Sequence, residues 1–561
     1  MARTVRIDSL TMSARRFKHW GWGYEDQWPA LEQLREGAGA LGERLAEIAI
    51  TVGEIEEPAP LQALKLRVPH IGVPRALAEI AANDDHARAS HALGKSYVDV
   101  VRGFRGEYEH PPDLVAFPRD ERDVQRVLEW CSGERVAAIP YGGGTSVVGG
   151  VSPEIPDGYN GVVSLDLRAL ERVLEVDQLS RAARIQAGAA GPVLEAGLGA
   201  HGLTLRHFPQ SFEFSTLGGW IATRAAGHFA TARTHIEDFV ESVRAITPAG
   251  VWASRRLPGS GAGVSPDRML AGSEGTLGVI TEAWVRVQPR PSHRRSVGVG
   301  FASFSEGAEC VRAISQSGLN PSNCRLIDAR EARLTMAGDG EHALLVLGFE
   351  STDHSVDHAL ERGLEICADH GGEPLGGREQ PGRATALHSG DEQAGGDAVS
   401  SWRSAFLAAP YLRDTFVAMG VLSETFETAI TWERFPSFHQ RVSAVAEEAL
   451  AEAAGKRDPA GLMTTRFTHV YPDGPAVYFT VIAPARRREE AEQWGAIKRA
   501  VSDAVIAEGG TITHHHAVGR DHRPWYDEQR PDPFALALAG AKAAVDPAAI
   551  MNPGVLVDPL R

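Results

Sequence analysis

The sequence is short of cysteine pairs, of long apolar runs and of positive charge. Its 561 residues include four cysteines, none within a CxxC pair, at positions Cys131, Cys310, Cys324 and Cys367. This spacing argues against a disulfide framework, an iron–sulfur cluster and a thiolate zinc site, so we expect reduced, buried thiols. No run of about 18 apolar residues could span a bilayer, and the amino-terminus lacks the apolar core of a secretory signal. These absences predict a cytoplasmic protein.

Acidic residues outnumber basic ones. The 57 Lys and Arg against 73 Asp and Glu give a formal net charge of −16. Proteins that bind nucleic acids or anionic membranes over a broad surface need a basic face. The sequence therefore disfavours nucleic acid as a partner, although a local cationic pocket is compatible with this charge.

The pattern along the chain divides it into four regions, and the length alone predicts at least two domains. Residues 1–106 place apolar residues at helical spacing, which predicts a helical amino-terminal arm. Residues 107–292 predict an α+β domain, and residues 293–500 alternate strands and helices as a second, α/β domain. Residues 501–561 form a carboxy-terminal segment with a helix and a histidine run. The Gly-, Ser- and Asp-rich stretch 376–401 predicts a surface loop.

The arm contains an aromatic segment, HWGWGYEDQWP, at residues 19–29. Aromatic side chains bury large areas and pack well against one another. We therefore interpret this segment as a cluster that attaches the arm to the body of the protein, in preference to a direct role in a site.

A Gly-rich loop follows the predicted strand RVAAIPY. Three successive glycines, Gly142 to Gly144, allow a ligand to approach the backbone, and Thr145 and Ser146 add hydroxyl donors. Such a loop suits a pyrophosphate, whose charge successive N–H groups can bind. It is also compatible with a plain turn. It lacks the lysine of the nucleotide triphosphate-binding P-loop.

Two further loops make the pattern specific. PQSFEFSTLGGWIATRAAG (209–227) places small residues where a flat ring would need close backbone, and AGSEGTLGVITE (271–282) is a Gly/Thr loop that opens into a strand. Together with PYGGGTS, with the upstream PRDERDVQRVLEW and with the closing DPAAIMNPGVL, these loops resemble the FAD-binding domain of the vanillyl-alcohol oxidase type. This resemblance implies an α+β fold with a two-subdomain FAD-binding domain (107–292) and an α/β substrate-capping domain (293–500).

The resemblance assigns FAD contacts to three stretches. The first stretch would bind the pyrophosphate, the second would lie along the flavin and ribityl chain, and the third would close the cofactor site. His207 matches a family position near the flavin, where a structural role is equally compatible. The three stretches comprise Pro140, Tyr141, Gly142, Gly143, Gly144, Thr145 and Ser146; Gln210, Ser211, Phe212, Glu213, Phe214, Ser215, Thr216, Thr223, Arg224, Ala225 and Ala226; and Glu274, Gly275, Thr276, Leu277, Gly278, Val279 and Ile280. No residue matches the family's covalent attachment position, so non-covalent FAD is expected.

Within this superfamily the rest of the chain resembles the alkyldihydroxyacetonephosphate synthase family. The similarity begins at HWGWGYEDQ and is strongest in four later pieces. These pieces are NCRLIDAREAR (323–333), YLRDTFVAMGVLSETFETAITWERF (411–435), TTRFTHVYPDGPAVYF (464–479) and GGTITHHHAVGRDHRPW (509–525). The Ala- and Arg-rich composition suggests a bacterial homologue, in which Ala517 and Gln210 depart from the residues that are usual in the family.

Three residues of these pieces match functional positions of the family. Tyr478 matches the tyrosine that acts as acid and base, although a tyrosine in an alternating strand is more often part of a core. Its hydroxyl titrates near pH ~10, so it needs nearby cations to act as a base. Arg413 matches the arginine that binds the substrate, and its planar guanidinium suits a phosphate dianion. Arg325 matches an arginine that is required near the flavin, where it could stabilise developing negative charge.

The histidine run raises the question of a metal. Neighbouring residues of an extended strand point to opposite faces, so at most two of His514, His515 and His516 could reach one ion. The family's matching triplet is required for activity, and we favour proton handling over metal binding. Metal-dependent hydroxy-acid dehydrogenases carry HxGDGNxH and EHGxG, whereas this chain has HVYPDGPAVYF, which keeps His469 but no second histidine, and HHHAVG. We therefore predict no metal.

The resemblance implies a transferase in which FAD has no net redox role. The flavin N5 would form an adduct with the dihydroxyacetone carbon of acyl-dihydroxyacetone phosphate, the fatty acid would leave and a fatty alcohol would add, giving an ether-lipid precursor. In this hypothesis Tyr478, His514, His515, His516 and Arg325 are catalytic, and Arg413 binds the substrate. Partners would be these two lipids, with peripheral membrane contact and a homodimer.

Two other functions stay open on the sequence. An FAD-linked oxidase or dehydrogenase of a hydroxy acid or alcohol would use the same loops, although the altered metal motifs count against it. A flavin-binding protein without turnover would make the joint presence of Tyr478, Arg413, Arg325 and three histidines a coincidence.

Overall fold

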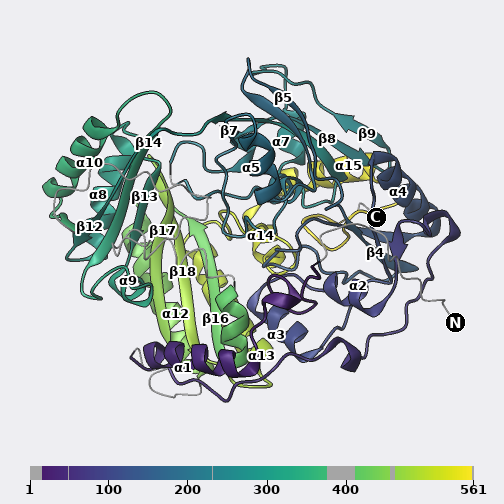
Figure 1. Ribbon diagram of the computed structural model, residues 1–561, viewed down its shortest axis with the longest axis horizontal. Helices are drawn as coiled ribbons and strands as arrows, with labels where there is room; N and C mark the ends of the chain where they lie inside the picture. Colours follow the sequence, from purple (N-terminus) through teal and green to yellow (C-terminus); the bar gives the residue numbers. More distant parts are fainter. Residues whose placement is uncertain (1–14, 48–49, 230, 376–410, 455–460, 559–561) are drawn as a thin grey trace.

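The protein is described by a computed structural model that covers residues 15–47, 50–229, 231–375, 411–454 and 461–558. The expected surface loop 376–401 lies outside these residues. The strands form three main sheets, and the helices pack around these sheets (Figure 1). The fold is therefore α+β, as expected. No helix in the described ranges is long and apolar enough to cross a membrane.

The first sheet has four strands in the order β1-β2-β4-β3, and the last three of these run parallel. Its strands are β1 (Ala81–Ala82), β2 (Leu114–Ala116), β3 (Val136–Tyr141) and β4 (Gly161–Asp166). Helix α4 (Glu121–Glu134) connects β2 to β3 and begins at an Asp120 side chain that accepts a hydrogen bond from the Asp123 N–H. Strand β3 ends at Tyr141, so the Gly-rich loop begins where this buried strand leaves the sheet.

The second sheet has five antiparallel strands in the order β5-β6-β10-β8-β9. Its strands are β5 (Val173–Asp177), β6 (Ala182–Gln186), β8 (Val240–Thr247), β9 (Gly250–Ala253) and β10 (Val279–Arg286). Helices α5 (Gly191–Gly199), α6 (Leu217–Thr223) and α7 (Pro266–Leu270) accompany it, and a short pair joins β7 (Leu203–Thr204) to β11 (Gln288–Pro289). The second and third loops that the resemblance assigns to FAD belong to this part of the molecule.

The third sheet has seven antiparallel strands in the order β15-β12-β14-β13-β17-β18-β16. These strands are β12 (His293–Phe301), β13 (Asn323–Ile327), β14 (Ala343–Ser351), β15 (Glu373–Leu375), β16 (Val421–Ala429), β17 (Leu462–Tyr471) and β18 (Gly474–Pro484). A tight turn at Pro472 and Asp473 joins β17 to β18 and pairs Arg466 with Tyr478. This pairing places the Arg466 and Tyr478 side chains of one hairpin directly beside each other.

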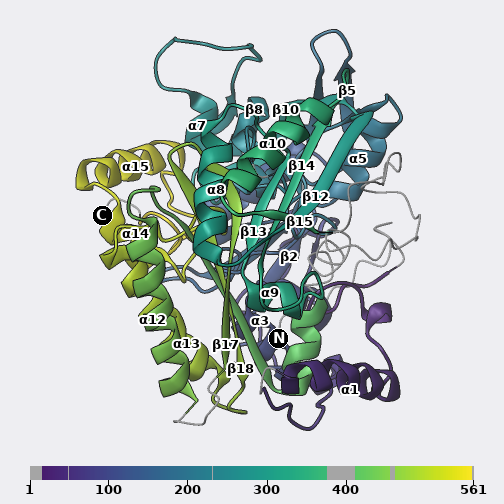
Figure 2. The same cartoon turned by 90° about the vertical axis from the view of Figure 1, so that its left-hand side faces the viewer.

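Helices cover the outer face of the seven-stranded sheet. They are α8 (Phe304–Gln316), α10 (Asp357–Asp369), α12 (Phe435–Ala453) and α13 (Glu490–Ala507), and Figure 2 shows α8 and α12 along this layer. Apolar side chains such as Phe426, Phe467 and Phe479 fill the space between sheet and helices. The opposite face of β16, β17 and β18 is consequently free to line a site.

The amino-terminal arm and the carboxy-terminal segment both pack against the sheets. In the arm, α1 (Leu31–Glu47) packs through Ala38 and Leu45 against Val421 and Ile482 at the lower end of the seven-stranded sheet in Figure 1. Helices α2 (Asp85–Ser90) and α3 (Tyr97–Arg105) follow. Beyond them, α14 (Arg523–Gln529), α15 (Asp532–Val545) and a bridge from Met551 to Ala138 attach the carboxy-terminal segment to the first two sheets.

Two expectations about side-chain packing are confirmed. All four cysteines are buried and free. The aromatic segment forms a cluster in which Trp20 packs edge-on against Trp28 and Phe104. Trp22 of the same segment is buried as well, and it also lines the cavity described below.

Candidate active site

A cavity of about 800 Å³ lies between the Gly-rich loops and the inner face of the seven-stranded sheet. Binding sites for cofactors and small molecules commonly have this size and lie between domains. The loop side is formed by residues 142–147, 209–211, 215–216, 219–220, 223 and 225–227, and the sheet side by Ser423, Thr425, Thr464, Arg466, Thr468, His469, Tyr478, Thr480 and Ile482. The cavity thus brings together loop residues that are up to 85 positions apart and strands of the second domain.

The Gly-rich loop has no room for side chains. A Cβ at Gly143 would overlap the carbonyl oxygen of Phe214, and one at Gly144 would overlap the hydroxyl of Tyr141. Gly144 also has a φ of 64°, a left-handed conformation that favours glycine. The loop backbone therefore lines the cavity directly. Together with the small lining residues Ser215, Thr216, Gly219, Ala225, Ala226 and Gly227, it fits a long, flat, anionic cofactor such as FAD.

The predicted FAD contacts divide into two groups. Those that line the cavity are Gly142, Gly143, Gly144, Thr145, Ser146, Gln210, Ser211, Ser215, Thr216, Thr223, Ala225 and Ala226. Those not among the described lining residues are Pro140, Tyr141, His207, Phe212, Glu213, Phe214, Arg224, Glu274, Gly275, Thr276, Leu277, Gly278, Val279 and Ile280. The contact roles of both groups remain predictions.

Two members of the second group, His207 and Glu274, contact residues next to the cavity-lining loops. His207 is buried beside Trp220 and Phe239, at ring distances of 5.1 and 5.7 Å. The Glu274 carboxylate accepts hydrogen bonds from the N–H groups of Val518 and Gly519 and so attaches the third loop to the carboxy-terminal segment. Burial raises the pKa of Glu274 to about 7.

Tyr478 lies at the centre of a row that crosses three strands. Its register partners are Glu427 on β16 and Arg466 on β17. Directly opposed residues of antiparallel strands project from the same face of the sheet, and this face lines the cavity. The catalytic tyrosine that the resemblance predicts is therefore flanked by one carboxylate and one guanidinium.

The surroundings of the Tyr478 hydroxyl act on its ionisation in opposite directions. The side chain is buried, which raises its pKa, whereas the charges of Arg466 and Arg413 lower it. The rings of His515 and His516 lie 6.1 and 5.6 Å from the tyrosine ring. Tyr478 is thus surrounded by the cations and imidazoles that an acid–base tyrosine needs.

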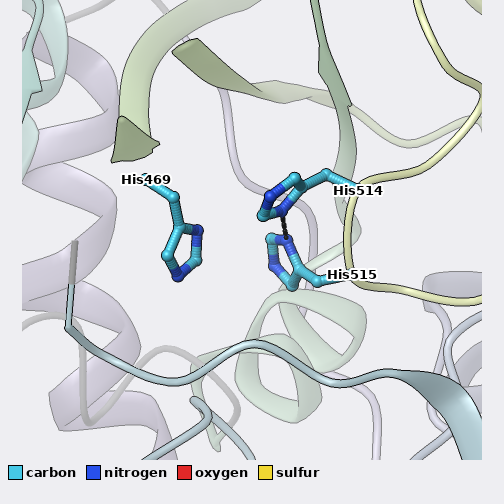
Figure 3. Close-up of side chains that lie close together, drawn as sticks. All are labelled: His469, His514 and His515. Atoms are coloured by element: carbon cyan, nitrogen blue, oxygen red, sulfur yellow. Dashed lines mark hydrogen bonds between the residues drawn. The ribbon is translucent and has the colours of Figure 1, made fainter. Parts of the chain in front are cut away.

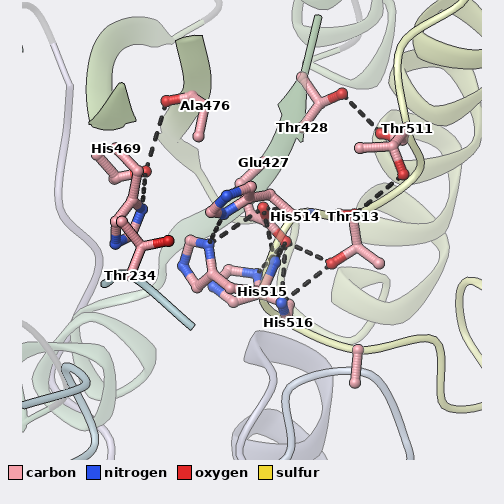
Figure 4. Close-up of polar contacts among 12 residues, drawn as sticks. Thr234, Glu427, Thr428, His469, Ala476, Thr511, Thr513, His514, His515 and His516 are labelled. Atoms are coloured by element: carbon pink, nitrogen blue, oxygen red, sulfur yellow. Dashed lines mark hydrogen bonds and ion pairs between the residues drawn. The ribbon is translucent and has the colours of Figure 1, made fainter. Parts of the chain in front are cut away.

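Glu427 holds the histidine triplet in place. Its carboxylate accepts hydrogen bonds from the N–H groups of His514, His515 and His516 and from the hydroxyl of Thr513 (Figure 4). Burial opposes the charge of Glu427, but the imidazoles of His515 and His516 and these hydrogen bonds keep its pKa well below the ordinary value. The triplet therefore wraps around one carboxylate and does not run as a straight strand.

The three histidines take different positions around this carboxylate. His515 and His516 line the cavity, whereas His514 lies behind them, with Nε2 2.7 Å from the Tyr471 hydroxyl and Nδ1 3.0 Å from Nδ1 of His515. Burial lowers the pKa of His514 and of His516 well below the ordinary value for histidine. Both rings are consequently neutral at pH 7 and can accept a proton.

One group of nitrogens has the spacing of a metal site. Ring nitrogens of His469, His514 and His515 lie within 4.8 Å of one another (Figure 3). The nitrogens of His469 already contact the Gly227 carbonyl at 2.8 Å and the Thr468 hydroxyl at 3.1 Å. An ion would have to replace hydrogen bonds of this network, so the arrangement is equally that of a proton relay.

The two predicted arginines both line the cavity. Arg413 lies in the helical stretch 411–419, and its Nη1 donates to the Lys95 carbonyl at 2.7 Å. Its neighbour Asp414 forms a buried ion pair with Lys18 at 2.9 Å. Arg325 of β13 is buried, and burial together with the charge of Arg466 lowers its pKa to about 9, so it remains charged at pH 7.

The far end of the cavity is apolar. It is lined by Leu41, Leu45, Leu334, Met336, Leu412, Phe416 and Ile482, with Arg44 at its border. Helix α1 of the arm supplies Leu41 and Leu45. The polar centre around Tyr478 thus continues into a space that suits a hydrocarbon chain.

The sequence predicted no role for Glu427, Arg466 or Glu331, and it predicted a packing cluster for the segment that contains Trp22. In the structure Arg466, Glu331 and Trp22 line the cavity, and Glu427 binds the histidine triplet. Glu331 and Arg466 form a buried ion pair at 2.7 Å inside the cavity wall. Each of the four lies within a segment that resembles the family, and Glu427 and Arg466 interrupt strand segments rich in apolar residues and threonine. That interruption is the signal that could have marked them.

Comparison with known proteins defines the class. Residues 112–254 match the family model "FAD binding domain" and residues 290–556 match "FAD linked oxidases, C-terminal domain". Solved structures of alkyldihydroxyacetonephosphate synthase (24% identity, TM-score 0.76, 97% of each chain) and p-cresol methylhydroxylase (15% identity, TM-score 0.67, 86% of this chain and 95% of that one) share the fold. The protein is an FAD-dependent enzyme whose fold is that of the FAD-linked oxidases.

Curated relatives define the family more narrowly. The alkyldihydroxyacetonephosphate synthases of Caenorhabditis elegans and Trypanosoma brucei brucei are 31% and 30% identical to the chain, over 85% and 84% of it and 81% and 78% of their own lengths. The mitochondrial cytochrome-linked D-lactate dehydrogenase of Arabidopsis thaliana is 26% identical over 80% of the chain and 74% of its own length. The chain belongs to the alkyldihydroxyacetonephosphate synthase family, as the four sequence pieces indicated.

Proposed function

We propose that the protein exchanges the acyl group of acyl-dihydroxyacetone phosphate for a fatty alcohol, as an alkyldihydroxyacetonephosphate synthase. The observation that supports this best is the position of Tyr478. It lies between the small-residue loops that suit FAD, the guanidinium of Arg413 and an apolar space. A phosphorylated substrate with a long acyl chain needs these features in one cavity.

The exchange conserves electrons. A C–O bond forms between the alcohol oxygen and the dihydroxyacetone carbon, a C–O bond to the fatty acid breaks, and the alcohol proton is taken up by the protein or the leaving carboxylate. FAD, when bound, supplies a nucleophilic centre for this chemistry without passing electrons to an acceptor. No oxidant is consumed.

The chain's own residues have separate tasks. The phenolate of Tyr478 removes the substrate's proton and the resulting hydroxyl returns it. His516, neutral at pH 7, accepts a proton from the entering alcohol, with His515 beside it. The Arg413 guanidinium binds the phosphate through paired N–H donors. Arg325 stabilises negative charge near the flavin.

The apolar end of the cavity binds the acyl and alkyl chains in this proposal. Its lining by helix α1 supports a role for the arm in lipid entry, with peripheral contact between protein and membrane. Cytoplasmic location, a homodimer and non-covalent FAD complete the proposal.

Label transfer without an electron acceptor tests the function. The purified yellow protein is incubated anaerobically with palmitoyl-dihydroxyacetone phosphate and labelled hexadecanol. Labelled ether product over many turnovers is the expected result, and Tyr478→Phe should lower the rate by about 10²–10⁴-fold while retaining FAD. Tyr526→Phe, a change outside the described cavity lining, is the matched control.

The oxidase alternative predicts the opposite outcome. A hydroxy acid or alcohol would bleach the flavin, and air would restore its colour, while no ether product would form. The retained His469 beside His514 is the feature that favours this alternative, because metal-dependent relatives of this fold keep a histidine there. Full turnover by the Tyr478→Phe protein would also overturn the proposal.

A further inference from the structure

Arg466 and Tyr478 are register partners, and their side chains are also in direct contact. The guanidinium carbon of Arg466 lies 3.8 Å from the centre of the Tyr478 ring. Cations within about 6 Å of an aromatic face interact favourably with its electrons. When the ring carries a phenolate charge, full charge attraction is added to this interaction.

Glu331 holds the guanidinium in that position. Its Oε1 accepts a hydrogen bond from Nη1 of Arg466 at 2.7 Å, and its Oε2 accepts one from the Thr464 hydroxyl at 3.2 Å. Both Arg466 and Glu331 are buried, so neither charge is screened by water. The Glu331 carboxylate thereby binds an edge of the guanidinium, while the tyrosine ring lies within contact distance of its central carbon.

The helix that carries Glu331 is itself attached to β17. Helix α9 (Ala329–Leu334) begins at Asp328, whose Oδ1 accepts the Glu331 N–H at 2.7 Å and whose Oδ2 accepts the Thr465 N–H at 2.6 Å. The residue next to Arg466 and the residue that binds Arg466 are therefore connected through one carboxylate. This attachment leaves the guanidinium little freedom to move away from the ring.

Other ionisable side chains also lie around Tyr478, and two of them are engaged elsewhere. Glu427 faces it from β16 but is bound to the histidine triplet, and Arg413 faces it from the helical stretch 411–419 but donates to Lys95. His515 and His516 face it from the carboxy-terminal segment. Arg325 of β13 adds a further positive charge behind Arg466.

We infer that Arg466, held by Glu331, is the positioning residue that stabilises the phenolate form of Tyr478 and so makes this tyrosine a competent base. The inference rests on the proposed acid–base role of Tyr478. Burial raises the pKa of the Tyr478 hydroxyl. Of the neighbouring charges, that of Arg466 opposes this rise most strongly. The arginine acts through the tyrosine, so its loss should reduce kcat more than it changes KM.

The ionisation of Tyr478 can be measured directly in the FAD-loaded protein. Tyrosine labelled with ¹³C at the ζ position reports ionisation by NMR, and the signal missing from Tyr478→Phe identifies residue 478 among the nine tyrosines. Arg466→Met should raise the pKa of Tyr478 by about one to two units. The rise of kcat with pH should move to higher pH by the same amount, and kcat at pH 8 should fall about 10- to 100-fold.

Three further variants separate electrostatics from packing. Arg466→Lys keeps the charge but not the planar group, so the pKa should rise by less than in Arg466→Met. Glu331→Gln removes a negative charge and keeps an acceptor for Arg466, so the pKa of Tyr478 should fall or stay the same. Arg441→Met removes an exposed arginine paired with Glu508 and should change neither quantity.

The signs of these shifts decide the inference. An unchanged Tyr478 pKa in Arg466→Met, or a rise in Glu331→Gln equal to that in Arg466→Met, would overturn it. If Arg466→Met does not fold, Arg466→Lys and Glu331→Gln give the same decision. Because the NMR titration needs no substrate, it can support the arginine–tyrosine interaction even where the ether product fails to form.

Discussion

At the scale of single residues, burial determines what the ionisable side chains of this protein can do. One cavity contains the neutral imidazole of His516, the hydroxyl of Tyr478 with its raised pKa, and the buried guanidiniums of Arg325 and Arg466. Removing charges from water is costly unless each has a partner. The charged residues of the site therefore have partners, as in the ion pair of Glu331 with Arg466. A single substitution should alter the ionisation or binding role of the residue and of its partner.

Replacement of Arg413 should weaken substrate binding. Arg413→Lys keeps the charge but loses the planar pair of donors, and we expect KM for the phosphorylated substrate to rise about tenfold, with a larger rise for Arg413→Ala. Steady-state kinetics at fixed fatty alcohol concentration measures this change. Arg362→Ala, which removes an exposed arginine, is the control. An unchanged KM in Arg413→Ala would remove this residue from the substrate site.

His207 should contribute to the pH dependence of stability. Burial lowers its pKa to about 3, so below its ordinary pKa of about 6.5 the unfolded chain binds a proton that the folded chain does not. This histidine therefore destabilises the fold as pH falls below about 6.5, by about 2 kcal/mol at pH 5.

The His207→Phe variant tests this sign. Its loss of stability between pH 8 and pH 5 should be smaller than that of the unchanged protein by about this amount in denaturant titrations. FAD affinity should stay the same, because His207 is not among the described lining residues. Weaker FAD binding would instead support the flavin contact that the resemblance allows.

At the scale of elements, the loops and strands of the site are connected through single carboxylates. Glu427 connects β16 to the histidine triplet, Glu274 connects the third loop to residues 518–519, and Asp328 connects α9 to β17. Each carboxylate accepts backbone N–H groups of another segment, and for Glu427 and Glu274 that segment is outside the regular strands. Buried N–H groups left without acceptors cost free energy.

Loss of Glu427 should therefore destabilise the triplet. Glu427→Ala leaves three histidine N–H groups without their acceptor, and we expect the free energy of unfolding at pH 7 to fall by about 3 kcal/mol. Because the folded-state pKa of Glu427 is depressed, its stabilisation is present above about pH 4.3 and is lost as pH falls through the folded-state pKa. The free energies of unfolding of Glu427→Ala and of the unchanged protein should therefore differ less in acid than at pH 7.

Chemical denaturation at pH 7 and below pH 4 measures this difference. Glu433→Gln, a change of an exposed acid close to the same strand, should leave the free energy of unfolding unaltered. Equal stability of Glu427→Ala and the unchanged protein at pH 7 would contradict the assigned role.

The Gly-rich loop should not accept a side chain. Gly143→Ala places a methyl group against the Phe214 carbonyl, so we expect loss of FAD binding and a lower Tm. Gly133→Ala in α4, where a Cβ meets nothing within 4 Å, should be neutral or stabilising by about 0.5–1 kcal/mol. Flavin fluorescence after gel filtration and thermal unfolding compare the two. Retention of FAD by Gly143→Ala would contradict the proposed cofactor cradle.

At the scale of the whole molecule, the cavity connects regions that are distant in the chain. Its wall contains residues of the arm, of the Gly-rich loops, of the seven-stranded sheet and of the carboxy-terminal segment. A ligand that contacts several of these regions stabilises all of them together, because it binds the folded state alone.

FAD should therefore stabilise the entire protein. Adding FAD at about 100 times its dissociation constant to the deflavinated protein should raise the free energy of unfolding by about 2.7 kcal/mol. Near-UV circular dichroism and tryptophan fluorescence should report the same upward shift of Tm. A shift that appears in one signal only would mean that FAD is held by one domain alone.

Several features of this protein were determined by local sequence. The Gly-rich loop at 142–144, the strand-forming residues of β18 and capped helices such as α8 each depend on a few neighbouring residues, whose backbone preferences act over short distances. For this reason the FAD loops, the order of elements and the histidine triplet could be recognised without a structure. The resemblance added Tyr478, Arg413 and Arg325.

Tertiary structure alone decided how these parts meet. The row Glu427–Tyr478–Arg466 depends on strand register, and a shift by one residue would turn each side chain to the other face. The wrapping of the triplet around Glu427 and the supply of apolar lining by α1 depend on contacts between segments hundreds of residues apart. Such contacts follow from the packing of whole sheets and helices, for which no short stretch of sequence carries the information.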